Sequence, residues 1–147
     1  MLVITPNDRC MKSVFLAGPS VRGEKTRTPW RQEAIWLFQA RKFGGELYVP
    51  EPFCDDYQAQ IDWEAEHLER ADLILFWIPR DLETLPGFTT NVEFGEWMKS
   101  GKVLLGAPSD APKMRYLFAK ARKYDVLCFH SLEAMVETAV RTLVCSG

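Results

Sequence analysis

The sequence predicts an α/β fold in which helices cover both faces of a parallel β-sheet. Short apolar runs, with the length and composition of buried strands, alternate five times with longer segments of helical spacing. The length of 147 residues fits one domain, which we expect to span residues 1–147. Such an alternation is typical of a doubly wound sheet in three α/β/α layers.

The first strand is predicted at residues 13–18, an apolar run that ends in glycine. The pair Thr28-Pro29 predicts the start of a helix, because proline favours the first helical position. The glycine pair at 44–45 predicts the end of this helix. The next apolar run predicts a second strand at 46–50.

The most hydrophobic run of the chain lies at residues 72–78, and we expect it to form the central strand. Parallel strands that are buried on both faces have continuous apolar runs of this kind. Helical spacing predicts one helix before it, over 61–71, and another after it, over 91–100, which Gly101 ends.

Two more strands and two more helices complete the prediction. We expect strands at 102–106 and 125–129, a helix over 111–123, and a last helix capped by Ser131. Right-handed crossovers leave few topologies, and we choose the flavodoxin-like strand order 2-1-3-4-5. The prediction is therefore a Rossmann-like, five-stranded parallel sheet in which the first and third strands are neighbours.

Composition excludes several classes of function. The net charge is −2 and there is no basic run, so we expect no nucleic acid polymer as partner. No apolar run approaches the roughly 20 residues of a membrane span. The first residues are too polar for a signal peptide. We therefore expect a cytoplasmic protein that does not bind membranes.

Cysteine and histidine usage does not indicate a metal centre. The four cysteines form no Cys-x-x-Cys pair, and neither His67 nor His130 stands at ligand spacing to them. We expect no metal site and no disulfide, in keeping with a reducing compartment.

Glu93 is the most informative residue, because it opens a predicted helix just beyond the central strand and its loop. Doubly wound sheets bind ligands at the carboxyl ends of the strands, where the strand order reverses. Here the loops at that point are 18–28 and 79–91, and Asn91 is suited to cap the helix that follows. A carboxylate there can be a nucleophile or base, and the helix amino end favours its ionised form. The alternative is a first-turn Glu that only stabilises its helix.

The loop after the first strand nearly matches the Gly-x4-Gly-Lys-Ser/Thr loop that binds nucleotide phosphates. Glu24 is an extra residue between the second glycine of the motif and its lysine. The helix is also predicted to start only at 28–29, after the loop, so we do not expect a phosphate-loop NTPase. Backbone amides of the loop, Ser20 and Arg22 could instead hold a phosphate or a sugar hydroxyl. The alternative is an ordinary strand-to-helix turn with an exposed arginine.

Other candidates lie on either side of the central strand. Asp62 or Glu64 could supply a second carboxylate, although acidic runs of this kind usually form a solvated helix face. Asp81 follows the central strand and is either a site acid or a turn residue. Trp63 and Phe88 could stack on a flat base, or pack in the core.

Three blocks of sequence together resemble a known family. They are Phe-Leu-Ala-Gly-Pro-Ser at 15–20, Glu-Arg-Ala-Asp-Leu-Ile at 69–74 and Asn-Val-Glu-Phe-Gly at 91–95. In this order and spacing, over roughly residues 13–106, they resemble the nucleoside 2-deoxyribosyltransferase superfamily. The run over 76–95 resembles its transferase-like branch.

The resemblance implies a reaction and roles for several residues. Glu93 would be the nucleophile that attacks the anomeric carbon of a 2-deoxyribosyl group and releases the base. Glu64 stands, in place of Asp, at the position of the family's other acid, and Asp81 matches an acid just after the central strand. Residues 20–23 match the Ser-x-Arg-Gly segment that holds the 5′-phosphate in deoxynucleotide N-hydrolases.

The resemblance also implies the partners. The substrate would be a small-molecule nucleoside or nucleoside 5′-monophosphate, and no cofactor would be needed. Family members complete their sites with a neighbouring subunit, so we expect a homo-oligomer. Large apolar residues on the helices also favour self-association, namely Trp97, Met98, Met114, Tyr116 and Phe118. We expect the substrate to be bound by Gly18, Pro19, Ser20, Arg22, Trp63, Phe88, Thr89 and Asn91.

Two other functions are compatible with the same fold. One is a non-catalytic nucleotide-binding module, in which Glu93 only binds ribose hydroxyls. The other is a flavodoxin-like redox or signalling protein. No Ser/Thr-rich loop of the kind that binds a flavin phosphate follows the first strand, which disfavours the second of these.

Overall fold

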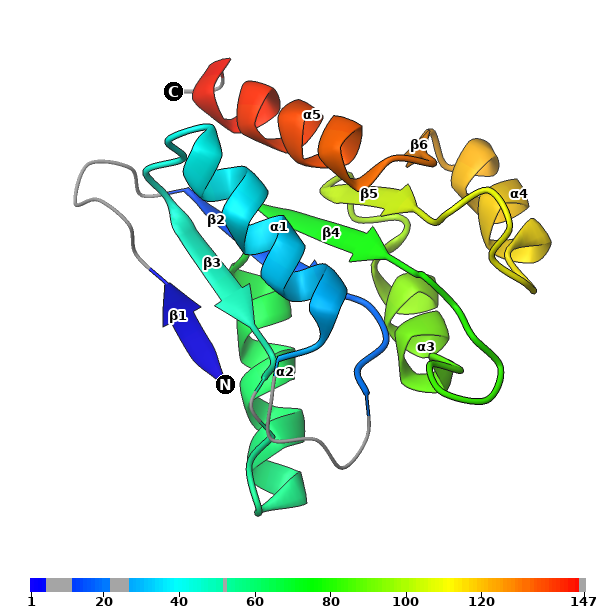
Figure 1. The fold of residues 1–147 in the computed structure, drawn as a ribbon, viewed down its shortest axis with the longest axis horizontal. Helices are drawn as coiled ribbons and strands as arrows, with labels where there is room; N and C mark the ends of the chain where they lie inside the picture. Colours follow the sequence, from blue (N-terminus) through cyan, green and yellow to red (C-terminus); the bar gives the residue numbers. More distant parts are fainter. Residues whose placement is uncertain (5–11, 22–26, 52, 146–147) are drawn as a thin grey trace.

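The protein folds around a six-stranded sheet, shown by a computed structural model that describes residues 1–4, 12–21, 27–51 and 53–145 (Figure 1). The strands are β1 (Leu2–Ile4), β2 (Ser13–Ala17), β3 (Glu46–Val49), β4 (Leu73–Trp77), β5 (Val103–Gly106) and β6 (Leu127–Phe129). Their order in the sheet is β1-β3-β2-β4-β5-β6. β1 is antiparallel to β3, and all other neighbours are parallel.

The strand order agrees with the sequence prediction, but the number of strands does not. β2 to β6 correspond to the five predicted strands in the order 2-1-3-4-5, and β2 pairs with β4 as expected. The sixth strand is β1, which adds to the edge of the sheet beside β3. It has only three residues, too few for a periodic pattern to be read from the sequence.

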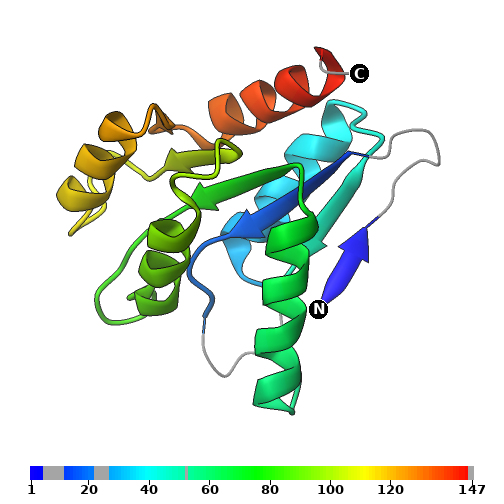
Figure 2. The same cartoon turned by 180° about the vertical axis from the view of Figure 1, so that it is seen from behind.

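Helices cover both faces of the sheet, as expected (Figures 1 and 2). They are α1 (Pro29–Ala40), α2 (Tyr57–Arg70), α3 (Phe88–Trp97), α4 (Arg115–Lys123) and α5 (Leu132–Cys145). α1 and α5 pack in one core cluster, and α2, α3 and α4 pack in the other. Among these described helices, none combines the length and the apolar character needed to cross a membrane.

The two central strands explain how both cores form. Every residue of β2 and β4 is buried. Because side chains alternate along a strand, Val14 and Leu16 face the core with α1, while Phe15 and Ala17 face the core with α2 and α3. Continuous apolar runs are therefore needed at these positions.

Three helices begin at other residues than the sequence predicts, and two of these helices carry the candidate acids. α2 begins at Tyr57 rather than 61, and the carboxylate of its cap, Asp56, accepts from the amide of Ala59 at 3.1 Å. α3 begins at Phe88, one turn before Asn91, and α4 begins at 115 rather than 111. In contrast, Pro29 opens α1 and Ser131 caps α5, as predicted.

Lys102, directly before β5, caps the end of α2. Its Nζ donates to the carbonyls of Leu68, Glu69 and Ala71 at 2.8 to 2.9 Å, and it lies over the ring of Trp97. These carbonyls have no partner within the helix, so the cation satisfies the carboxyl end and offsets the helix dipole.

Lys102→Met should therefore lower the free energy of unfolding by about 1–3 kcal/mol, because charge-assisted hydrogen bonds are lost. Urea denaturation measures this loss. Lys99→Met is the matched control, since the exposed Lys99 interacts with the side chain of Tyr124 at the surface, and its loss should change stability by less than about 0.5 kcal/mol. Equal effects of the two substitutions would contradict the capping role.

Candidate active site

A cavity of about 490 Å³ opens at the carboxyl ends of the central strands, where the strand order predicts a ligand site. Its walls come from the loop after β2, from the loop after β3 with the start of α2, and from the loop after β4 with the start of α3. Its size and place are those of a small-molecule site.

Most of the predicted site residues line this cavity. They are Gly18, Pro19, Ser20, Glu64, Phe88, Thr89 and Glu93. Asp81, Trp63 and Asn91 do not line it. Arg22 lies outside the described residues.

Glu64 on α2 and Glu93 on α3 form a pair of carboxyl groups in the cavity. Burial, together with the negative charge of Glu64, raises the pKa of Glu93 to about 8, against the opposing charge of Arg31. Burial also raises the pKa of Glu64, although Gln60 donates to its Oε1 at 2.9 Å and Arg31 favours its ionised form. Two carboxyl groups with raised pKa values in one cavity are typical of acid–base sites.

The helix amino end does not favour the ionised form of Glu93, contrary to the expectation from the sequence. Because α3 begins at Phe88, Glu93 lies in the second turn rather than the first. The effect of the helix dipole is confined to the first turn. Burial and Glu64 therefore decide the pKa, and they raise it.

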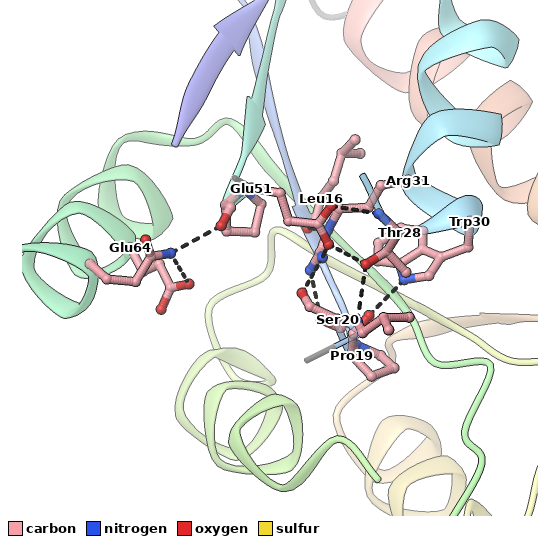
Figure 3. A network of polar contacts seen from close by, with 12 residues as sticks. Leu16, Pro19, Ser20, Thr28, Trp30, Arg31, Glu51 and Glu64 are labelled. Carbon is pink, nitrogen blue, oxygen red and sulfur yellow. Dashed lines mark hydrogen bonds and ion pairs between the residues drawn. The ribbon is translucent and has the colours of Figure 1, made fainter. Parts of the chain in front are cut away.

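Arg31, which lines the same cavity as Glu64 and Glu93, forms a buried ion pair with Glu51. Figure 3 shows this pair together with Glu64. Arg31 is 1% exposed and Glu51 is 3% exposed. Nη1 of Arg31 lies 2.5 Å from Oε1 of Glu51. The other oxygen of Glu51 accepts from the amide of Thr28 at 2.7 Å, and the Thr28 hydroxyl also donates to this carboxylate. Burial opposes ionisation of Glu51, but the charge of Arg31 and these hydrogen bonds hold its pKa below the ordinary value.

Arg31 fixes the loop after β2. Its Nε donates to the carbonyl of Leu16 at 3.0 Å, its Nη2 to the carbonyl of Gly18 at 2.6 Å, and its Nη1 to the hydroxyl of Ser20 (Figure 3). Trp30 donates from its ring to the carbonyl of Pro19 at 2.9 Å. Because the Ser20 oxygen accepts from Arg31, the hydroxyl proton is free to donate to a ligand in the cavity.

Gly18 is required by the close approach of its neighbours. A Cβ on this residue would lie 2.2 Å from the carbonyl oxygen of Trp77 and 2.6 Å from the ring of Trp30. The first loop can therefore lie against β4 only with glycine at this position.

The sequence carried a signal for Arg31 that our prediction did not use. Arg31, Ala34, Ile35 and Phe38 stand at i, i+3, i+4 and i+7, and all four are buried. A charged residue on the apolar stripe of a helix indicates a buried partner. The partner, Glu51, directly follows the predicted second strand, at the edge where ligands bind.

Aromatic side chains surround the mouth of the cavity. Phe88 lines it, as predicted, and is 70% exposed. Phe53, Tyr57 and Ile61 line it from the other side and are also exposed. The prediction missed Tyr57 because it placed the start of α2 four residues too late, and it missed Phe53 because it did not assign the loop after β3 to the site. Exposed rings beside a polar cavity can stack on a flat base.

Asp81 behaves as a turn residue. Its side chain is exposed, and Oδ1 accepts from the amides of Glu83 and Thr84 at 2.9 Å each. Hydrogen bonds from Thr84 and then Glu83 lower the pKa of Asp81 below its ordinary value. The carboxylate thus organises the loop after β4 and does not reach the cavity.

Trp63 and Asn91 have partners of their own. Trp63 stacks on the ring of His67 at 4.0 Å and lies 6.1 Å from that of Phe15, so it packs against the core. Asn91 does not cap α3, since its amide donates to the carbonyl of Gly87 inside the helix. Its side-chain oxygen accepts from Arg80.

A family model for nucleoside 2-deoxyribosyltransferase-like proteins matches residues 11–111. The match includes the three loops of the cavity and both carboxyl groups, and it confirms the resemblance seen in the sequence. No curated protein matches the chain. The matched segment spans more than half of the 147 residues. The chain therefore belongs to the nucleoside 2-deoxyribosyltransferase-like family.

Proposed function

We propose that this protein breaks the N-glycosidic bond of a nucleoside or nucleoside 5′-monophosphate, with Glu93 as nucleophile and Glu64 as acid. The observation that carries the proposal is the pair of carboxyl groups in one cavity, each with a raised pKa. Family membership supports a role in nucleoside glycosyl chemistry. The aromatic mouth supports a flat base as one part of the ligand.

The proposed reaction has two steps. A carboxylate oxygen of Glu93 bonds to the anomeric carbon, while the electrons of the N-glycosidic bond move to the base, which takes a proton from Glu64. The sugar is then held as an ester of Glu93. A second base or a water molecule attacks the same carbon in the next step, gives its proton to Glu64, and frees Glu93.

The protonation state of the pair suits this division of roles. The pKa of Glu93 near 8 leaves this group mostly protonated at neutral pH, and burial also disfavours the ionised form of Glu64. The chemistry needs one carboxylate and one carboxylic acid. Positive charge developing on a bound sugar next to Glu93 would favour the negative charge there and the proton on Glu64.

The pH dependence follows from the same pair. When both groups are protonated there is no nucleophile, and when both are ionised there is no acid; Glu93 itself ionises near pH 8. We expect kcat/KM to pass through a maximum and to fall above about pH 8, measured from about pH 5 to about pH 9.5. In Glu64→Gln the residual activity should rise with pH and then stay level. A wild-type rate that stays level above pH 8 would contradict the role of Glu64 as acid.

A preference for 5′-monophosphates is a further part of the proposal. Arg31 already donates to four acceptors, so its guanidinium is not available for a second bidentate anion contact. Among the described residues, the Ser20 hydroxyl and the backbone of the loop after β2 remain available to bind a phosphate oxygen. Arg22, which lies outside the described residues, would supply the charge for the phosphate.

A panel of nucleosides and their 5′-monophosphates, incubated with and without an acceptor base, tests the proposed function. Chromatography should show free base from at least one substrate, and a new nucleoside when transfer occurs. Arg22→Ala should weaken turnover of monophosphates and leave nucleosides unaffected. Ligand binding without any released base would favour the non-catalytic nucleotide-binding module instead.

We also propose that the protein forms a homo-oligomer, but for a different reason than the sequence offered. Met114 belongs to the core, and Trp97, Met98 and Phe118 pack against it, which leaves only Tyr116 of that set exposed. Exposed apolar side chains surround the cavity instead. A neighbouring subunit placed there would cover them and exclude water from the site.

A further inference from the structure

Arg80 is a buried cation without an acidic partner. It follows β4 by three residues and is 6% exposed. Within the described part of the chain, no carboxylate forms an ion pair with it. Its Nε is buried and has no hydrogen-bond partner there. Buried charges are normally paired, so this arrangement needs an explanation.

The surroundings of Arg80 do not compensate its charge. Arg80 lies beside Gly87, the residue that precedes the first turn of α3. A Cβ added to Gly87 would lie 3.6 Å from Nη1 of Arg80. The amino end of a helix is positive and repels a cation. Burial lowers the pKa of Arg80, although a guanidinium stays charged at neutral pH. The charge itself therefore does not stabilise this region.

The hydrogen bonds of Arg80 connect three separate segments. Nη1 donates to the carbonyl of Pro86 at the end of the long loop, and Nη2 donates to Oδ1 of Asn91 on α3 at 2.5 Å. Nη2 also lies 3.7 Å from the sulfur of Met114, just before α4. The planar guanidinium thus sets the distance between the end of the loop and the first turns of α3.

The segment that Arg80 holds is a wall of the cavity. Residues 86–90 line it, and Glu93 follows on the same helix. A Cβ added to Gly87 would also lie 3.5 Å from Cβ of Pro19, so this wall packs against the loop after β2. A shift of the wall would change both the shape of the cavity and the position of Glu93.

We propose that Arg80 is a positioning residue, which holds residues 86–93 so that Glu93 faces the cavity at the place where a sugar would bind. The proposal rests on the function proposed above, since it assigns Arg80 to that same site. It explains why a costly buried cation is kept, because Arg can bridge two acceptors in a fixed geometry.

Arg80→Met removes both hydrogen bonds and the charge. We expect kcat to fall at least tenfold while KM changes by less than about threefold, since small misplacements of reacting groups are costly. Arg80→Lys keeps the charge but lacks the planar guanidinium that bridges two acceptors, and its kcat should fall to a similar degree. Asn91→Ala removes one acceptor from a half-exposed position and tests the same link if Arg80→Met fails to fold.

The Glu93 carboxyl provides a readout that does not depend on activity. Its titration, followed by NMR on the protein labelled with 13C at Glu carboxyl carbons, should show a pKa near 8 in the wild type. In Arg80→Met and Asn91→Ala water should reach the carboxyl, and this pKa should fall by at least about one unit. The control is Lys102→Met, which also removes a cation that bonds several acceptors, but a partly buried one at the opposite ends of the strands, and it should leave kcat and the Glu93 titration unchanged.

These results separate the two proposals. A wild type that releases no base would reject the proposed function, while a lowered Glu93 pKa in both variants would still support the positioning role. Unchanged titration and kcat in a folded Arg80→Met or Asn91→Ala variant would overturn that role. Wild-type kcat in Arg80→Lys would overturn it as well, because the charge alone would then suffice.

Discussion

Glu93→Gln is expected to abolish release of the base, lowering kcat/KM by at least about a thousandfold. The amide keeps the size of the side chain but cannot form the sugar ester. Base release is measured by chromatography on the best substrate of the panel. Glu96→Gln, an exposed change on the same helix, is the matched control and should keep nearly full activity.

The stability of Glu93→Gln should show that the fold is intact. The pKa of Glu93 is about 8 in the folded protein and 4.5 ordinarily, so the wild type loses stability as pH rises between these values. Glutamine does not titrate. The variant should therefore resemble the wild type near pH 4.5 and melt at a higher temperature near pH 9. Near wild-type turnover by Glu93→Gln would reject the nucleophile and favour the binding-module alternative.

Arg31→Met should produce the largest loss of stability. It leaves the buried carboxylate of Glu51 without its partner, which typically costs about 3–5 kcal/mol. The first loop also loses the donors that hold Gly18 and Ser20, so activity should fall in conditions where the variant is folded. Urea denaturation at neutral pH measures the change in stability.

Two comparisons sharpen this test. Arg41→Met breaks the exposed pair with Glu133 and should cost less than about 1 kcal/mol. The double variant Arg31→Met with Glu51→Gln should be more stable than Arg31→Met alone, because no charge is left buried. A loss in Arg31→Met no greater than that in Arg41→Met would show that the buried pair does not hold the fold together.

Much of the fold was predictable because periodicity and turn residues act locally. The continuous apolar run of β4 predicted a central strand, and Thr28-Pro29 predicted the start of α1. The start of α3 was not predicted, because Asn91 is a good cap by type. In the structure Gly87 precedes the helix with φ of 68°, and the Asn91 side chain bonds Arg80 instead. A tertiary contact thus overrode a local preference.

The candidate site was predictable where it depended on topology. The order of the strands brought the loop with Ser20 and the helix with Glu93 to one cavity. The pair of Arg31 and Glu51 depends on how α1 lies across the sheet, and no local pattern gives the partner of a buried charge. The raised pKa of Glu93 depends on burial and on the approach of Glu64, which also arise only in the folded chain.

Mass spectrometry of the protein after incubation with a 2-fluoro nucleoside analogue tests the covalent role of Glu93 most directly. The fluorine slows the second step, so the sugar should remain attached as an ester. We expect the intact mass to rise by one sugar and fragmentation to place the adduct on Glu93, with no adduct in Glu93→Gln. Release of base from the analogue without an adduct, or an adduct on Glu64, would contradict the proposed mechanism.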